Sequence, residues 1–268
     1  MKVLHICNHF WPNTGGIEKF TLDLCRESKA IGIESSVICL NKPHQSKTVL
    51  PAEDELDGIG IKRLPFLNLQ YYKPALVPIS ELKKADVIHL HGVSALSDFV
   101  ILTKWLHGTP IVMNTHGGIF HTKAIEGIKK AYFFGWQKVM LQGVDQVVAD
   151  SENDFKLFKP LSKRIIMIEN GVDLARFKKV AGQKKRPNTF LFVGRISKNK
   201  QIDFLLQIFG LLHAKGIDFE LRIVGVDWQG IRDELEELAK GLGIENKVVF
   251  TATNAETGEP VSDSTISI

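Results

Sequence analysis

The stretch HFWPNTGGIEKF, residues 9–20, joins a short apolar segment to an amphipathic one. The segment before it, KVLHIC at residues 2–7, predicts a strand of the kind that parallel sheets bury. After it, Ile17, Phe20 and Leu24 recur near helical spacing with charged residues between them. A strand, a glycine turn and a helix in this order predict an anion site, because free backbone N–H groups and the helix dipole point toward the loop.

Gly15 and Gly16 could serve either a ligand or the turn itself. Two adjacent glycines let a ligand approach the backbone closely, whereas a tight strand-to-helix turn uses glycine for positive φ and needs no ligand. The stretch does not match the common phosphate-binding motifs. The stretch lacks both G-x-G-x-x-G and the Gly-Lys-Ser/Thr of a Walker A loop, and no acidic residue ends the next predicted strand.

Predicted strands and helices alternate from the first residues to about residue 173, which predicts an α/β fold with a doubly wound parallel sheet. A looser region is expected at 41–58. The strands are expected at 35–40, 59–64, 85–92, 109–118 and within VDQVVADS and KRIIMIENGVD, and the helices at 95–108, at 123–141 and just before Pro160.

The chain is expected to contain two domains. Residues 1–173 are expected to form the first domain. Residues 174–188 are basic and have no apolar periodicity, which predicts a linker. The strand–helix pattern restarts over residues 189–250, which are expected to form the second domain. Residues 251–268 are polar and predict an irregular tail. Because three strands and two helices make a thin core, the second domain is expected to be incomplete.

Composition and charge exclude several classes of protein. With 268 residues, 44% hydrophobic and 24% charged, the chain has the composition of a globular protein. A net charge of +4 suits an anionic substrate but is too weak to indicate nucleic acid, and no nucleic-acid motif is present. Three cysteines without a C-x-x-C motif, together with the absence of a signal peptide and of a long apolar run, favour a cytoplasmic protein.

The loops after the predicted strands are where a parallel sheet presents ligands. Arg195 follows a strand and Lys200 precedes a helix, so the two cations could clamp a diphosphate; the alternative is that they are solvated loop charges and that Arg195 pairs with a carboxylate. His116 could donate to a substrate hydroxyl or leaving group, or it could simply be packed and hydrogen-bonded. Further candidates that line this region are Ser151, Asn170, Gly171 and Gly194.

Two other patterns have competing readings. His89 and His91 alternate along a strand and could share a metal ion, but no third ligand accompanies them, so no metal site is predicted. The helix at 123–141 mixes lysines with aromatic residues. It could lie on an anionic membrane or be a core helix with a solvated lysine face.

Six motifs carry a resemblance to a known family: PNTGGIE, VIHLHG, NTHGG, VVADS, IENGVD and FLFVGRISKNKQIDFLL. In this order and spacing they resemble the retaining GT-B glycosyltransferases of family four, the group 1 family, over residues 1 to about 250. The resemblance implies two Rossmann-like domains that face a cleft, with residues 1–173 on the acceptor side and 189–250 as part of a nucleotide-sugar-binding domain.

The resemblance also implies roles for single residues. Gly15 and Gly16 would approach the donor phosphates, His116 would be the catalytic-site histidine that contacts the transferred sugar, and Arg195 and Lys200 would neutralise the leaving nucleoside diphosphate. Fixed cations stabilise the transition state there, because charge develops on the diphosphate as the glycosidic bond breaks. The implied donor is a GDP- or UDP-linked sugar, which is a substrate, and no metal or other cofactor is expected.

The sequence departs from the family pattern in two places. Gln201 stands where many members have glycine, and the paired glutamates of the far C-terminal half are absent, so a truncated or frameshifted member is expected. HGGIFHT and the basic aromatic helix are similar to members that add mannose or glucose to polyprenyl-linked sugars in envelope or exopolysaccharide synthesis, at the inner face of the plasma membrane. The first hypothesis is therefore a retaining hexosyltransferase acting on a glycan or polyprenyl-linked acceptor.

Two rival hypotheses stay open. One is a non-catalytic module that binds a sugar or a partner chain, the latter at the edge of the incomplete sheet. The other is a metal hydrolase built on the histidines.

Overall fold

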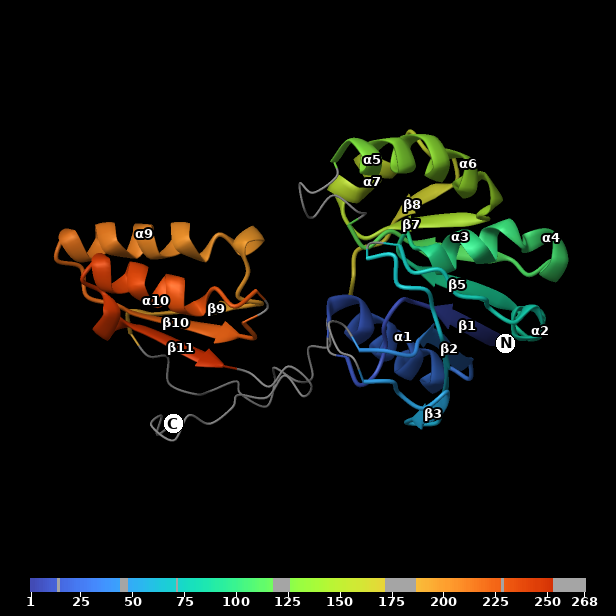
Figure 1. Cartoon of the computed structure of the whole chain (residues 1–268), viewed down its shortest axis with the longest axis horizontal. Helices are drawn as coiled ribbons and strands as arrows, with labels where there is room; N and C mark the ends of the chain where they lie inside the picture. The colour runs from blue at the N-terminus through green and yellow to red at the C-terminus, as the bar shows by residue number, and fades with distance from the viewer. Residues whose placement is uncertain are drawn as a thin grey trace. The chain divides into compact units, whose positions relative to one another are not determined.

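The structure, a computed structural model, describes residues 1–13, 15–43, 48–70, 72–117, 126–171, 187–227 and 229–252. The chain divides into two compact units, Met1–Val172 and Asp173–Ile268, coloured from blue to yellow and from orange to red in Figure 1. The expected linker at 174–188 lies outside the described residues except for its last two positions.

Within the described part of the first unit, eight strands form one sheet in the order β3-β4-β2-β1-β5-β6-β7-β8, parallel throughout except for the pair β3 and β4. This confirms the predicted α/β fold. The strands are β1 (Lys2–Ile6), β2 (Glu34–Leu40), β3 (Glu53–Leu56), β4 (Ile59–Leu64), β5 (Val87–His91), β6 (Ile111–Asn114), β7 (Gln146–Ala149) and β8 (Ile165–Met167). The helices are α1 (Gly16–Ala30), α2 (Ile79–Lys84), α3 (Ala95–Leu102), α4 (Lys104–His107), α5 (Glu126–Ala131), the π-helix η1 (Tyr132–Gln137), α6 (Lys138–Met140), the 3-10 turn η2 (Leu141–Gly143) and α7 (Glu152–Phe158).

The central strands are buried on both faces. Along β2, Val37 and Cys39 pack into one apolar cluster with Cys25 of α1, while Ile38 and Leu40 pack into a second, larger cluster. Successive side chains of a strand point to opposite faces, so each face of the sheet has its own core. All three cysteines of the chain are buried and free, as the sequence predicted.

The expected loose region at 41–58 is wrong in part, because it contains β3, which pairs with the predicted strand β4 as a hairpin. The hairpin turns at Asp57 and Gly58, both with positive φ. Asp-Gly is a strong hairpin signal for this reason. The expected helix at 95–108 is also divided, at Thr103, into α3 and α4.

A buried carboxylate anchors the helical segment 126–143. Asp98 of α3 is 1% exposed and accepts hydrogen bonds from the Tyr132 hydroxyl (2.7 Å), Trp136 Nε1 (3.0 Å) and Gln137 Nε2 (2.6 Å), and from the Tyr72 hydroxyl (3.1 Å). Three of these donors lie in η1. Donors from two separate segments thus satisfy the oxygens of this buried side chain, as burial of a polar group requires.

The described residues of the second unit form a three-stranded parallel sheet in the order β11-β10-β9 with two longer helices. Its elements are β9 (Thr189–Val193), the 3-10 turn η3 (Lys198–Lys200), α9 (Ile202–Ala214), β10 (Glu220–Gly225), α10 (Arg232–Gly241), the 3-10 turn η4 (Glu245–Lys247) and β11 (Val248–Ala252). β11 extends two residues into the segment 251–268 that was expected to be irregular.

Gln201 joins η3 to α9 in the left-handed region, with φ 51° and ψ 43°. A side chain there strains the backbone, whereas glycine does not. The geometry gives a physical reason why the family that the sequence resembles prefers glycine at this position.

We expect Gln201→Gly to raise the free energy of unfolding by about 0.5–1 kcal/mol, because it relieves the left-handed strain. Urea denaturation followed by circular dichroism measures the change. Gln207→Gly is the matched control: Gln207 is exposed inside α9, where glycine should cost about 1 kcal/mol. Destabilisation by both variants would contradict the strain at Gln201.

Candidate functional site

The strand order of the first unit reverses at β1, which lies between β2 and β5. Open α/β sheets bind ligands beyond the carboxyl ends of their strands at such a reversal. The loops after β1, β5, β6 and β7 therefore form the candidate site of this unit.

The pairing of β1 with β5 brings three histidines together. His5 lies opposite His89 in the register, and His91 follows on the same face of β5. His5 Nδ1 lies 3.0 Å from His91 Nε2, and one ring nitrogen from each of the three lies within 4.8 Å of the others. Sequence reasoning noticed His89 and His91 but missed His5, because strand register is not visible in a single strand.

His116 continues this cluster from the loop after β6. Its Nε2 lies 3.1 Å from His91 Nδ1, and its Nδ1 lies 2.6 Å from Asp150 Oδ2. The side chain is 5% exposed, and both ring nitrogens have partners within the protein. Phe20 of α1 packs edge-on against the rings of both His91 and His116.

Two aspartates after β7 hold the loop that carries His116. Asp150 accepts from the His116 backbone N–H (3.0 Å) and from Asn114 Nδ2 (2.6 Å), and Asp154 accepts from Thr115 Oγ1 (2.9 Å) and the Gly117 N–H (3.0 Å). His116 has φ 47°, a strained value for a non-glycine residue, so these bonds hold it in a conformation that it would otherwise avoid.

The buried groups titrate away from their usual ranges. Burial lowers the pKa of His5 to about 3, with a smaller effect of His89, and burial is also the main reason that the pKa of His91 lies well below 6.5. Burial opposes ionisation of Asp150, but hydrogen bonds from His116 and Asn114 hold the pKa of Asp150 below its usual value. At neutral pH, His5 and His91 are therefore uncharged and Asp150 is ionised.

Neither Gly15 nor Gly16 has positive φ, so the reading that the turn needs glycine for its backbone conformation is wrong. Gly15 is the N-cap of α1, and a Cβ there would clash with the Glu18 carboxylate. A Cβ on Gly16 would meet no atom of the described residues within 4 Å. The helix start is therefore open at Gly16.

The other predicted site residues lie in three places. Ser151 caps α7, its Oγ accepting from the Asp154 N–H at 3.2 Å, and Asn170 and Gly171 are exposed beyond β8. Gly194, Arg195 and Lys200 belong to the second unit, after β9 and before α9; Arg195 and Lys200 are both exposed. Their roles toward a donor stay predictions.

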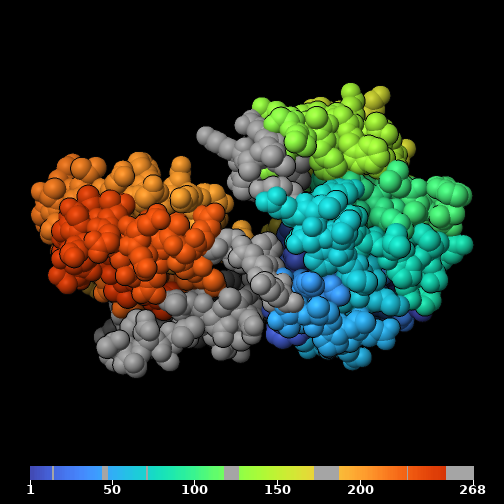
Figure 2. Space-filling model, viewed as in Figure 1, coloured from blue at the N-terminus to red at the C-terminus, as the bar shows by residue number. Residues whose placement is uncertain are grey.

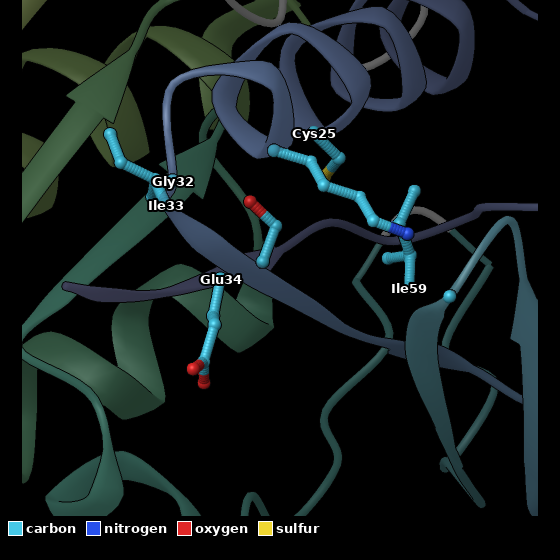
Figure 3. Close-up of a pocket in the computed structure, with 8 residues that line it drawn as sticks. Cys25, Gly32, Ile33, Glu34 and Ile59 are labelled. Carbon is cyan, nitrogen blue, oxygen red and sulfur yellow. The ribbon is translucent and has the colours of Figure 1, made fainter.

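A pocket of about 400 Å³ lies elsewhere in the first unit (Figure 3). Its lining includes Cys25 and Lys29 of α1, Glu34 at the beginning of β2 and Ile59 at the beginning of β4. It therefore lies at the amino end of β2, away from the loops described above. Burial raises the pKa of Cys25 to about 12, so this thiol is a poor nucleophile.

We expect acid to weaken the first unit through its neutral histidines. The folded pKa of His5 lies below its unfolded value of 6.5, so its contribution to stability is present above pH 6.5 and is lost as pH falls toward 3, by about 2 kcal/mol at pH 5. His5→Gln, which does not titrate, should flatten the loss between pH 7 and 5 in urea denaturation. His213→Gln, at an exposed position of α9, should leave the slope unchanged. Equal slopes in all three proteins would contradict the prediction.

Comparisons with known proteins agree with this architecture. Residues 14–176 match the family Glycosyltransferase Family 4, and residues 174–260 match Glycosyl transferases group 1. The chain is 33% identical to the GDP-mannose:cellobiosyl-diphosphopolyprenol alpha-mannosyltransferase of Komagataeibacter xylinus, over 96% of this chain and 66% of that protein. It is 32% identical to the enzyme of the same name from Xanthomonas campestris, over 96% of this chain and 68% of that one.

Solved structures share the fold at low identity. Anabaena HepE in complex with UDP has a TM-score of 0.66 at 18% identity, covering 96% of this chain and 71% of HepE. A glycosyltransferase from Rickettsia africae has a TM-score of 0.64 at 16% identity, covering 96% of this chain and 69% of that one. The chain spans about two thirds of the length of the curated relatives named above. By its family matches and its fold, the chain belongs to the group 1 glycosyltransferases of family 4.

Proposed function

We propose that the protein transfers a hexose from a GDP- or UDP-linked donor to a glycan or lipid-linked acceptor, with retention of anomeric configuration. The observation that carries the proposal is the 33% identity, over 96% of the chain, to a relative named as a GDP-mannose-dependent mannosyltransferase that acts on a diphosphopolyprenol-linked sugar. GDP-mannose and a polyprenyl-linked glycan are therefore the first donor and acceptor to test.

The second unit supplies the cations for a leaving diphosphate. Arg195 directly follows the Gly194 turn at the carboxyl end of β9, and Lys200 ends η3 just before α9. Both are exposed. A strand end, two cations and a helix start suit an anion, and cations placed where charge develops accelerate bond breaking.

A second candidate function is binding without transfer. β9 lies at one edge of the described three-stranded sheet, and its side chains Phe190, Leu191 and Val193 are 48%, 65% and 70% exposed. An exposed apolar edge strand favours a partner chain that adds to the sheet.

We expect Arg195→Ala/Lys200→Ala to bind GDP and UDP at least about 150-fold more weakly than the unmodified chain, because each of the two charge-assisted contacts contributes about 1.5–3 kcal/mol. Isothermal titration calorimetry measures the affinities. Lys198→Ala, which removes an exposed cation from the same 3-10 turn, is the matched control and should stay within about twofold. Equal loss in both variants would contradict a specific clamp, and a folded chain that binds neither nucleotide would favour the second candidate.

We also propose a peripheral contact with an anionic membrane through the surface of α3, α4 and α6. Trp105 and Val139 are 81% and 63% exposed, and Leu102 of α3 and Leu106 of α4 are 48% and 38% exposed. α3 contacts α6, and the green surfaces of residues 95–107 and 126–143 meet in Figure 2. Lys138 adds an exposed cation beside Val139. Among the helices that the structure describes, none has the length and apolar character needed to cross a bilayer.

The expected result is sedimentation of the chain with vesicles that contain anionic lipid, and its release at high salt. Trp105→Ser/Val139→Ser should reduce the bound fraction severalfold, because it removes apolar surface from the contact. Leu211→Ser, at a 66% exposed position in α9, is the control and should leave binding unchanged. Equal binding to neutral vesicles would contradict the electrostatic part of the proposal.

A further inference from the structure

The hydrogen bonds of the histidine cluster form one continuous chain. It runs from Asp150 Oδ2 to His116 Nδ1 (2.6 Å), from His116 Nε2 to His91 Nδ1 (3.1 Å), and from His91 Nε2 to His5 Nδ1 (3.0 Å). His5 and His91 are 1% and 4% exposed. This row of hydrogen bonds ends at His5 Nε2, a buried atom that has no hydrogen-bond partner among the described residues.

The two ends give this chain a direction. An ionised Asp150 only accepts, so His116 carries a proton on Nδ1. In this direction His116 accepts at Nε2 from His91 Nδ1–H, and His91 accepts at Nε2 from His5 Nδ1–H. His5 Nε2 is left as a bare lone pair. The opposite direction would need a doubly protonated His116 and would bury an N–H of His5 without an acceptor, which is rarer and more costly.

A neighbouring hydrogen bond agrees with the same direction. Asn114 donates its amide to Asp150, so its carbonyl oxygen faces His89 Nε2 at 2.7 Å and must accept from it. His89 is therefore protonated on Nε2, whereas His5, His91 and His116 are protonated on Nδ1. A neutral imidazole has one donor and one acceptor, so this assignment leaves no two donors facing each other.

We propose that His91 is a positioning residue for His116. His91 accepts a hydrogen bond from His5 and donates one to His116 Nε2, so that His116 keeps its only N–H directed at Asp150 and its Nε2 as an acceptor. A ligand that displaces His91 from Nε2 must donate a hydrogen bond. The ring thus selects a sugar hydroxyl and rejects a phosphate or carboxylate oxygen. This inference rests on the proposed function, and it differs from the sequence-based expectation that His116 donates.

The competing reading is a metal ion held by His5, His89 and His91. Such an ion would have to break the bond between His5 and His91. It would also place charge among three neutral ligands in a buried site, with Asp150 reached only through His116. The hydrogen-bonded chain accounts for the same side chains without either cost.

Two-bond ¹⁵N–¹H correlation spectra of the full chain, with each histidine assigned by single substitution, read the tautomers directly. At neutral pH, His5, His91 and His116 should be protonated on Nδ1. His107 is the internal control: it accepts from the Thr109 N–H at Nδ1 and lies 3.0 Å from the Val100 carbonyl at Nε2, so it should be protonated on Nε2. An Nε2–H pattern at His91 or His116, or a shift of the His5, His89 and His91 signals on adding Zn²⁺, would overturn the proposal.

His91→Phe tests the positioning role, because it removes both hydrogen bonds and keeps an apolar ring of similar size. The His116 Nε2 signal should move while the His107 signals do not. Because a sugar hydroxyl no longer has to break the hydrogen bond between His91 and His116, the variant should bind GDP-mannose about 2- to 10-fold more tightly and GDP as the unmodified chain does. Unchanged affinity for GDP-mannose together with an unchanged His116 spectrum would refute the role. If the unmodified chain binds no nucleotide, the proposed function fails, whereas the tautomer spectra still decide the direction of the chain.

Discussion

The Asp150 carboxylate is the interaction on which the candidate site depends. It accepts the backbone N–H and Nδ1–H of His116 and the amide of Asn114, and thereby ties the end of β6 to the end of β7. A histidine with φ 47° needs such support, since that backbone conformation costs of order 1–3 kcal/mol. Because the carboxylate can only accept, it also determines where the protons of the neighbouring imidazoles lie.

The sheet explains why this carboxylate has so many polar neighbours. His5, His89 and Asn114 come from three adjacent parallel strands, and their side chains stand near the carboxyl ends of those strands, where the strand order reverses. On their other face these strands are apolar, with Leu4 and Ile6 of β1, Ile88 and Leu90 of β5, and Ile111 and Met113 of β6 in the larger cluster. This group of buried polar side chains thus lies at the edge where a doubly wound sheet places its ligands.

Sequence periodicity predicted β4 to the residue, since alternation and flanking turn residues coincide there, and it located β2, β5 and β7 within a few residues. It missed β3, although Asp57-Gly58 is a hairpin signal, because the polar segment EDEL has no apolar pattern. Among the site residues it singled out His116 but not His5, Asn114 or Asp150. Those three form contacts across strands, and pairing between strands far apart in the chain leaves no trace in local spacing.

The buried Asp98 has a consequence for how such a protein can diversify. Its three donors in η1 fix the rotation of that helix about its own axis, because turning the helix by one residue would remove all three hydrogen bonds at once. The outer face of segment 126–143 is therefore not adjustable by rolling the helix. The charge and polarity of this face can therefore change only by substitution of the outward side chains. Such substitutions leave the hydrogen bonds to Asp98 in place.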